Sequence, residues 1–568
     1  MKLTIQGKGQ EVTIDKRNFL AKGGEGEIYA KDQIVYKICD PGKMIPAGKF
    51  AELAVLTDSH IIKPEDILLD SKGVAVGYTM KFVPDTFTLC QIFTKAFRTR
   101  NNITPDMVIK LVQQMQGVIN GIHGSSILLV DLNELNFLLS QNFKDVWFID
   151  VNSYQTPSYR ATAIMDSIRD RHCQNNQFTT GTDWFSFAVV AFQMLIGIHP
   201  FKGRHPKFTD PRTAMDQRML QNVSVLNSEV TYPLGACQPI TNIPKVYLDW
   251  FIAVFEKGMR VAPPKDLVTA IIMQAVQQVV TSSNSYEIKL MHEFADTIVN
   301  YYFHAGKEVV ITNSLAYIDK RPMTLPASNI NIVFTPNMNR PVGAYIQGKA
   351  LKLYDFYGQS EISCTINASN IMDYEGRLYI QNGMNVMEIL FTELPATTLV
   401  SSHKVGTCME QATKFYDGVV IQCMFDSYYA SIFPATKQCY QLPLNELTKY
   451  KIVDAKFSRG VLMVVGVNQN GQYDRFVYRC TKQMTLELLK TATDVTFSSL
   501  NFTVLDNGIC ITITEDEKIE IFRSDTGSSS VKVVDDDTIT GDMMLTSKGA
   551  VTMFYQESKL HTITSRTK

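Results

Sequence analysis

The sequence predicts an α+β domain of two lobes followed by an all-β domain. Up to about residue 90, short β-like runs alternate with polar turns, and from about Pro105 apolar residues recur at the three- to four-residue period of helices. Beyond about residue 285 the helical period almost vanishes, and short runs rich in Val, Ile, Tyr, Phe and Thr take its place. A chain of 568 residues also exceeds the size at which one hydrophobic core keeps growing, so at least two domains are expected.

The predicted domain boundary lies in the polar tract Thr281–Ser285, whose composition suits a linker. We expect the first domain to span residues 1–280, with an N-lobe of about 1–83 and a C-lobe of about 84–280 that ends in a helix from Asp266 to Val280. Residues 281–285 form the linker, and residues 286–568 form the β domain.

A glycine recurs along the β half, each time followed by an apolar strand, a polar turn and a second strand. It stands at Gly306, Gly343, Gly376, Gly418, Gly460, Gly508 and Gly549. The intervals of 33 to 48 residues match the length of a four-stranded propeller blade. The β half therefore resembles a seven-bladed β-propeller; six blades, or two β-sandwiches in series, are the alternatives.

The composition limits the classes of partner. With 55 basic and 56 acidic side chains, no overall charge favours nucleic acid or a membrane surface. The ten cysteines include no CxxC pair and read as reduced thiols, and the N-terminus lacks the apolar run of a signal peptide. The longest apolar stretch, Trp184 to Ile198, is too short to cross a bilayer comfortably. We expect a cytoplasmic protein that binds neither nucleic acid nor membrane, and the sequence leaves its oligomeric state open.

The first chemical motif is the glycine-rich run KGGEGEIY, which lies between two β-like runs. Its Gly23, Gly24 and Gly26 allow backbone N–H groups to approach phosphates, and we expect Ile28, on the strand that follows, to contact the nucleotide as well. Lys37, on the next strand, can pair with the α- and β-phosphates of a nucleotide. Taken alone, this segment reads equally well as a plain hairpin loop.

The second motif is ILLVDLNELNFLL, in which Asp131 and Asn136 are five positions apart, followed by Asp150 after a β-like run. Phosphoryl transfer needs a carboxylate that accepts the proton of the acceptor hydroxyl, and oxygen ligands that hold Mg²⁺ against the nucleotide phosphates. Asp131 suits the first role, and Asn136 and Asp150 suit the second. A purely structural role is less natural, because carboxylates in apolar surroundings are costly without a partner.

These motifs, in this order over residues 20–260, resemble the eukaryotic-like Ser/Thr protein kinase superfamily. The runs GGEGEIY, DLNELN, IDVNSYQ and FAVVAFQMLIGIHPF are similar to divergent bacterial and phage kinases often described as helix-hairpin-helix proteins with a kinase domain. The resemblance covers about half of the chain and implies a bilobal fold that uses ATP and Mg²⁺. It also implies that Asp183 supports the catalytic loop from below, and that Glu52 pairs with Lys37.

The resemblance further assigns the nucleotide-binding hinge. Met80 stands at the gatekeeper position, and the backbone from Lys81 to Val83 would hold adenine. Asn133 replaces the lysine that helps to neutralise the transferring phosphoryl group.

Other departures affect regulation. The usual His-Arg-Asp is Leu129-Val130-Asp131, which removes the arginine that receives an activation-loop phosphate. The usual Asp-Phe-Gly is Asp150-Val151-Asn152, and no clear Ala-Pro-Glu closes the segment. Since the base and metal positions are all kept, we expect retained activity.

The leading hypothesis is therefore an ATP- and Mg²⁺-dependent Ser/Thr protein kinase whose propeller binds a protein substrate or partner. A second hypothesis is a pseudokinase that senses nucleotide, with the propeller as an assembly platform. A third is an enzyme of kinase fold that modifies a small molecule or transfers AMP.

Overall fold

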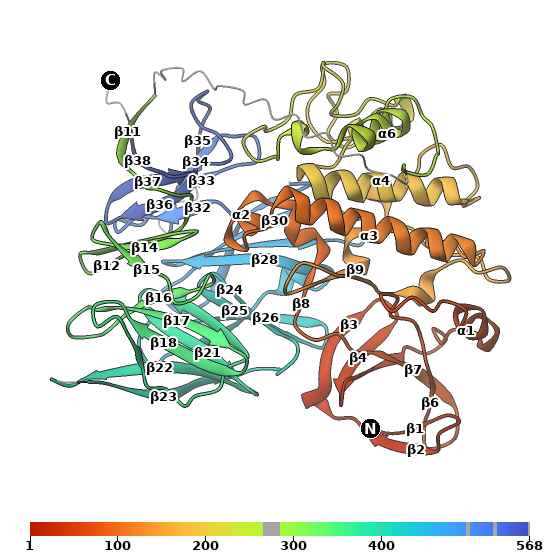
Figure 1. Ribbon diagram of the computed structural model, residues 1–568, viewed down its shortest axis with the longest axis horizontal. Helices are drawn as coiled ribbons and strands as arrows, with labels where there is room; N and C mark the ends of the chain where they lie inside the picture. The colour runs from red at the N-terminus through yellow and green to blue at the C-terminus, as the bar shows by residue number, and fades with distance from the viewer. Residues whose placement is uncertain (265–284, 396, 496–499, 526–530, 566–568) are drawn as a thin grey trace.

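The protein is described from a computed structural model over residues 1–264, 285–395, 397–495, 500–525 and 531–565. Figure 1 shows a small β-rich lobe in red, a helical lobe in orange and yellow, and a large all-β part in green to blue that lies along both. The helix expected from Asp266 to Val280 and the first four residues of the expected linker lie outside the described residues.

The N-terminal lobe is one antiparallel sheet in the order β2-β1-β6-β7-β5-β4-β3. Its strands are β1 (Lys2–Ile5), β2 (Gln10–Thr13), β3 (Phe19–Gly23), β4 (Gly26–Lys31), β5 (Ile34–Cys39), β6 (Ile67–Leu69) and β7 (Ala75–Lys81). The short helix α1 (Ala47–Leu53) follows β5, and its Leu53 is buried in the core of the helical lobe. This lobe therefore places the glycine run and Lys37 on adjacent strands.

The helical lobe is built around α4, whose residues from Asp183 to Ile196 are all buried. Its helices are α2 (Lys95–Arg100), α3 (Pro105–Gly124), α4 (Thr180–Ile196), α5 (Ala214–Gln221) and α6 (Lys245–Phe255). A small sheet, in the order β10-β9-β8, contains β8 (Thr86–Thr88), β9 (Phe137–Ser140) and β10 (Val146–Phe148). Short 3₁₀ turns occur at η1 (Lys16–Asn18), η2 (Leu89–Phe93), η3 (Glu134–Asn136), η4 (Val151–Ser153), η5 (Asp166–Ile168) and η6 (Ile240–Asn242).

Local signals explain the limits of α4. Thr179 and Thr182 form a reciprocal capping box at its start, and Gly197, with φ of +93°, ends it in a left-handed conformation. Among the described residues, none of the helices is both long enough and apolar enough to pass through a membrane.

The C-terminal part is all-β, with one short 3₁₀ turn, η7 (Asn445–Leu447), among its described residues. Its strands form seven four-stranded antiparallel sheets over the described ranges. Six are consecutive: β12–β15 (Ile298–His304, Lys307–Thr312, Leu315–Ile318, Arg321–Thr324), β16–β19 (Asn331–Phe334, Pro341–Gln347, Ala350–Asp355, Ser360–Ile362), β20–β23 (Asn370–Tyr374, Arg377–Asn382, Asn385–Glu393, Thr398–Thr407), β24–β27 (Thr413–Tyr416, Val419–Met424, Ser427–Ile432, Tyr440–Pro443), β28–β31 (Lys451–Ser458, Val461–Val467, Tyr473–Cys480, Leu486–Ala492) and β32–β35 (Phe502–Val504, Ile509–Ile513, Ile519–Arg523, Lys532–Val534).

The remaining sheet joins the two ends of the β half. It contains β36 (Met544–Lys548), β37 (Val551–Gln556), β38 (Lys559–Ser565) and, paired with β38, the early strand β11 (Tyr286–Glu293). The edge strand β36 of this sheet contacts β32, which belongs to the sheet β32–β35. It also contacts β12, which belongs to the sheet β12–β15. The two ends of the β half therefore meet through both strand pairing and sheet contact.

The recurring glycines have one structural cause at six of their seven positions. They stand in the hairpin between the first and second strand of a sheet, with φ between +65° and +86°. A positive φ strains any residue with a Cβ, so glycine suits these turns. Gly343 differs, because it lies inside β17, where a Cβ would come within 2.3 Å of Ile330 Cδ1.

The β half packs against both lobes of the first half. Val453, Val465 and Tyr473 belong to the same apolar core as α3 and α4, and Met409 belongs to the core of the N-terminal lobe. Ion pairs of 2.8 Å, 2.9 Å and 2.6 Å also cross between the two halves: Lys22–Asp426, Lys202–Asp494 and Arg204–Asp516.

We predict that Gly418→Ala destabilises the β half more than Gly306→Ala. Both glycines have positive φ, which costs an alanine roughly 1–2 kcal/mol. At Gly418 the new Cβ would also meet Phe457 O at 2.3 Å, whereas at Gly306 nothing lies within 4 Å. Overpacking should therefore add about 1–3 kcal/mol at Gly418 alone. Urea-unfolding midpoints measure the difference, and equal losses in the two variants would contradict it.

Candidate active site

The start of α4 carries a buried carboxylate, Asp183, that holds the chain just ahead of Asp131. Asp183 Oδ2 accepts a hydrogen bond from Leu129 N at 2.8 Å, and Oδ1 accepts one from Val130 N at 2.9 Å. His123 Nε2 lies 2.9 Å from Asp183 Oδ2. Val130 has a φ of +63°, which a β-branched residue rarely adopts. The hydrogen bonds that the N–H groups of Leu129 and Val130 donate to Asp183 fix this turn. This is the supporting role that the sequence resemblance implied for Asp183.

Asp131 and Asn136 are joined within one loop between α3 and β9. Asn136 Nδ2 donates to the Asp131 carbonyl at 2.9 Å and approaches Asp131 Oδ2 at 3.5 Å. Asp131 Oδ1 accepts from Met165 N at 2.8 Å. Burial raises the pKa of Asp131 above its ordinary value, and the hydrogen bonds from Met165, Asn133 and Asn136 only partly offset this rise.

Lys37 brings the N-terminal lobe to Asp150. On β5, Lys37 is buried, and its Nζ lies 3.6 Å from Asp150 Oδ1. Asp150 has a φ of +59° at the start of η4, directly after the strand β10 and Ile149. Burial raises the pKa of Asp150, and the charge of Lys37 opposes that rise. Three separate stretches of sequence thus contribute Lys37, Asp131 and Asp150 to one region between the lobes.

The glycine run forms the hairpin between β3 and β4, in which Gly23 pairs with Gly26. Gly26, with φ of +154°, packs so closely on β5 that a Cβ would meet Ile38 O at 2.1 Å. Nothing lies within 4 Å of a Cβ built on Gly24. The turn therefore presents Gly24 and Glu25 at an open tip while Gly26 anchors it to the strand that carries Lys37.

The hinge residues expected from the sequence belong to one small apolar cluster. Met80 is buried in it beside Val35, and Ile28, Val83 and Ile149 are partly buried against the same cluster. Lys81, the last residue of β7, is exposed. The cluster gives an apolar wall next to Lys37 and Asp150, the surroundings that a flat aromatic base requires.

Glu52 does not contact Lys37 in the described structure. Its Oε2 instead accepts a hydrogen bond from Ser158 N at 3.2 Å, and the carboxylates within ion-pair distance of Lys37 belong to Glu25 and Asp150. The reason is the short helix α1, whose buried polar residue is Lys49 and not Glu52. Burial lowers the pKa of Lys49, and the charges of Glu25 and Asp150 oppose that change.

Asn133 is turned toward its own backbone. Its side chain is buried, and its Oδ1 accepts from Leu135 N at 2.9 Å, which caps η3. The next residue, Glu134, is also buried and accepts a hydrogen bond from the hydroxyl of Tyr473 at the start of β30. Burial raises the pKa of Glu134. The β half therefore touches the loop that carries Asp131 and Asn136.

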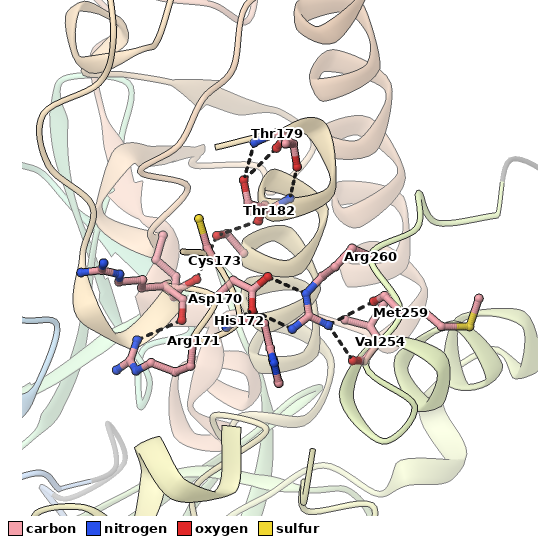
Figure 2. Close-up of polar contacts among 12 residues, drawn as sticks. Asp170, Arg171, His172, Cys173, Thr179, Thr182, Val254, Met259 and Arg260 are labelled. Atoms are coloured by element: carbon pink, nitrogen blue, oxygen red, sulfur yellow. Dashed lines mark hydrogen bonds and ion pairs between the residues drawn. The ribbon is translucent and has the colours of Figure 1, made fainter. Parts of the chain in front are cut away.

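The segment that follows Asp150 is closed by a buried ion pair. Figure 2 shows the guanidinium of Arg260 facing Asp170 and reaching the carbonyls of Val254, in the last turn of α6, and of Met259, beyond it. The two Arg260 nitrogens lie 2.6 Å and 2.7 Å from the carboxylate oxygens of Asp170. Burial raises the pKa of Asp170, but the hydrogen bonds and charge of Arg260 outweigh burial and hold it below the usual value. No Ala-Pro-Glu motif ends this segment, and the Asp170–Arg260 pair ties it to the helical lobe.

Asn136 and Asp150 could hold a divalent metal. Ile149 N donates to Asn136 O at 3.0 Å, which brings Asn136 beside the strand that leads to Asp150. An amide and a carboxylate oxygen suit Mg²⁺, which keeps several waters and takes further ligands from phosphates. No group of three or more His, Cys, Asp or Glu side chains within the described ranges could bind a metal by itself. The oxygen set thus fits Mg²⁺ only together with phosphate oxygens.

Sequence patterns assigned no contact to Glu25, Tyr473 or the Asp170–Arg260 pair, and they marked Asn152 only as the residue in place of the glycine of Asp-Phe-Gly. Glu25 could have been noticed in the sequence, because it is the one charged residue between the glycines of the predicted turn. The other contacts join residues 90 or more positions apart, and nothing in local spacing points to them.

No protein-family model matches the chain, and neither does any curated protein. One solved structure, described as the structure of the Cydia pomonella granulovirus kinase PK-1, is 15% identical in sequence; 42% of this chain and 88% of that chain are covered, with a TM-score of 0.31.

We predict that Arg260→Met costs about 3–5 kcal/mol of stability, because it leaves the buried Asp170 carboxylate without its partner. Lys245→Met is the matched control, since the exposed Lys245–Asp249 pair should contribute no more than about 1 kcal/mol. Chemical denaturation measures both variants. Equal losses would show that the Asp170–Arg260 pair does not hold the segment.

The same pair has a defined pH dependence. Because the pKa of Asp170 is held below its ordinary 3.8, the stabilisation is fully present above that pH and is lost as the pH falls through the lower folded-state pKa. The stability difference between the wild type and Arg260→Met should therefore stay constant near neutral pH and shrink as the pH falls, first through the pKa that burial raises for Asp170 in the variant and then through the lowered pKa of the wild type.

Proposed function

We propose that this chain is an ATP- and Mg²⁺-dependent protein kinase that phosphorylates Ser or Thr hydroxyls. The main support is the convergence of Lys37, Asp131 and Asp150, from three stretches of sequence, between a β lobe and a helical lobe. Phosphoryl transfer depends on positioning and on charge stabilisation, so a site of this kind needs few reactive groups.

Each residue of the candidate site has a separate role in this proposal. Lys37 binds the nucleotide phosphates, the Gly23–Gly26 turn covers them, and the apolar cluster of Met80 and Val83 takes the base. Asn136 and Asp150 would hold Mg²⁺, which supplies positive charge against the phosphate oxygens. Asp131 orients the acceptor hydroxyl and takes its proton, while the hydroxyl oxygen bonds to the γ-phosphorus and the bond to the β–γ bridging oxygen breaks, releasing ADP.

The same proposal includes the β half as a seven-bladed propeller that recruits a protein substrate or partner. Its support is the run of four-stranded sheets, the pairing of β11 with β38, and the contact of β36 with β12. The hydrogen bond between Tyr473 and Glu134 supports this role, because it joins the β half to the loop that carries Asp131.

We predict that Asp131→Asn loses phosphoryl transfer by about 10²–10⁴-fold, because the proton acceptor is gone, and still binds Mg²⁺–ATP. The control is Asp145→Asn, which removes a half-buried carboxylate of the same lobe, on the turn before β10. Transfer of labelled γ-phosphate and nucleotide-induced thermal shifts measure the two properties. Since burial raises the pKa of Asp131, the wild-type rate should fall on acidification at a pH above 3.8.

Three outcomes would overturn the proposal. Equal labelling of the wild type and Asp131→Asn removes Asp131 from the reaction. Stabilisation by Mg²⁺–ATP without any transfer favours a nucleotide-sensing scaffold. A mass increase equal to AMP, in place of phosphate, identifies a different group transfer.

A further inference from the structure

The tip of the glycine turn carries a carboxylate that folds back onto Lys37. Gly24 and Glu25 connect the paired glycines Gly23 and Gly26. Glu25 Oε2 lies 3.3 Å from Lys37 Nζ and accepts a hydrogen bond from Asn152 Nδ2 at 2.8 Å. A residue expected only to span a turn thus contacts the candidate phosphate-binding lysine.

Asn152 completes the set of contacts around Lys37. Its side chain is buried, and its Oδ1 accepts from Lys37 Nζ at 3.2 Å. Lys37 Nζ therefore faces two acceptors, Glu25 and Asn152, and also lies within ion-pair distance of Asp150. An ammonium group has three N–H donors, so these acceptors fix the direction in which Lys37 points.

The geometry leaves no comparable role for α1. Glu52 accepts from Ser158 N, and the residue of α1 buried toward Glu25 and Asp150 is Lys49, a cation. In the described structure, the carboxylate that contacts Lys37 from the N-terminal lobe comes from the Gly23–Gly26 turn and not from the helix.

We propose that Glu25 is the positioning residue for Lys37, with Asn152 as the amide that bridges them. One short turn then has two tasks, since it covers the phosphates and aligns the lysine that binds them. Alignment of Lys37 follows from closure of the Gly23–Gly26 turn and needs no movement of α1. This inference rests on the proposed kinase function, because it gives Lys37 its phosphate-binding role.

The first test compares Glu25→Gln with Glu27→Gln. The two residues stand two positions apart and lose the same charge, but Glu27 bonds to Tyr29 and not to Lys37. We expect Glu25→Gln to lower kcat by about 10–100-fold, the loss that misplacement of a catalytic group by about 1 Å can cause. The Kd for Mg²⁺ with a non-hydrolysable ATP analogue should change much less, and Glu27→Gln should resemble the wild type.

A double-mutant cycle separates positioning from a general effect on the fold. In the Lys37→Met background, Glu25→Gln should cost nothing further, because the residue it positions is absent. Additive losses would overturn the proposal. So would tighter nucleotide binding with an undiminished kcat in Glu25→Gln, which would make Glu25 a group that the phosphates displace. A loss of kcat in Glu52→Gln with none in Glu25→Gln would return the role to α1.

A measurement without substrate keeps this proposal distinct from the proposed function. Acetic anhydride labels lysines in the nucleotide-free protein, and mass spectrometry follows the Lys37 peptide. Release of Lys37 in Glu25→Gln should speed its acetylation by about tenfold or more, the size expected for loss of one hydrogen bond to a charged group, with no change in Glu27→Gln. If the wild type transfers no phosphate, the proposed function fails, and the acetylation rates still decide whether Glu25 holds Lys37; equal rates in all three proteins would overturn the contact.

Discussion

The geometry of the candidate site depends on one buried carboxylate, that of Asp183. It accepts hydrogen bonds from the backbone N–H groups of Leu129 and Val130, the two residues ahead of Asp131. A left-handed backbone at Val130 costs roughly 1–3 kcal/mol, whereas hydrogen bonds to a charged group contribute about 1.5–3 kcal/mol each. The two bonds therefore outweigh the strain. Because Asp183 belongs to helix α4, which is buried from Asp183 to Ile196, the rigidity of the helical core passes directly to the loop that carries Asp131 and Asn136.

The β half adds a second constraint, since it contacts both lobes at once. Met409 packs in the core of the N-terminal lobe, whereas Val453 and Val465 pack in the core of the helical lobe. A hinge motion between the lobes would have to break one of these apolar contacts or deform the β half. Burial of a large aliphatic side chain contributes about 1.5–3 kcal/mol, so wide opening is costly. Smaller elements, such as the Gly23–Gly26 turn, are better suited to move if the proposed nucleotide binds.

Local patterns were sufficient to predict much of the fold. The change from a helical period to short β runs identified the all-β part, and the recurring glycines marked six hairpins because their positive φ is a local requirement. Gly343 shows the limit of that reasoning, since its cause is close packing against Ile330 within a strand. The spacing of Asp131 and Asn136, five positions apart in one loop, likewise reflects local backbone geometry.

Contacts between distant segments could not be predicted in this way. Lys37 and Asn152 are 115 positions apart, Asp170 and Arg260 are 90 apart, and Glu134 and Tyr473 are 339 apart. Each contact depends on how whole elements pack, and one sequence gives no measure of that. The expected Lys37–Glu52 contact depended on the length and rotation of α1, which is too short to carry a hydrophobic period that would fix its facing side.

The charges around Lys37 explain why the turn, and not the helix, supplies its counter-ion. Lys37 and Lys49 are both buried, and Glu25 and Asp150 lie close to both. Two buried cations need two anions nearby, because an unpaired charge away from water is strongly unfavourable. If Asp150 serves as a metal ligand, its charge is taken up by the metal, and Glu25 becomes the remaining anion for two lysines. Mg²⁺ would bring two positive charges, of which Asp150 offsets only one, so a metal-loaded site would carry net positive charge beside Lys37, which favours the phosphates of a nucleotide over a neutral ligand.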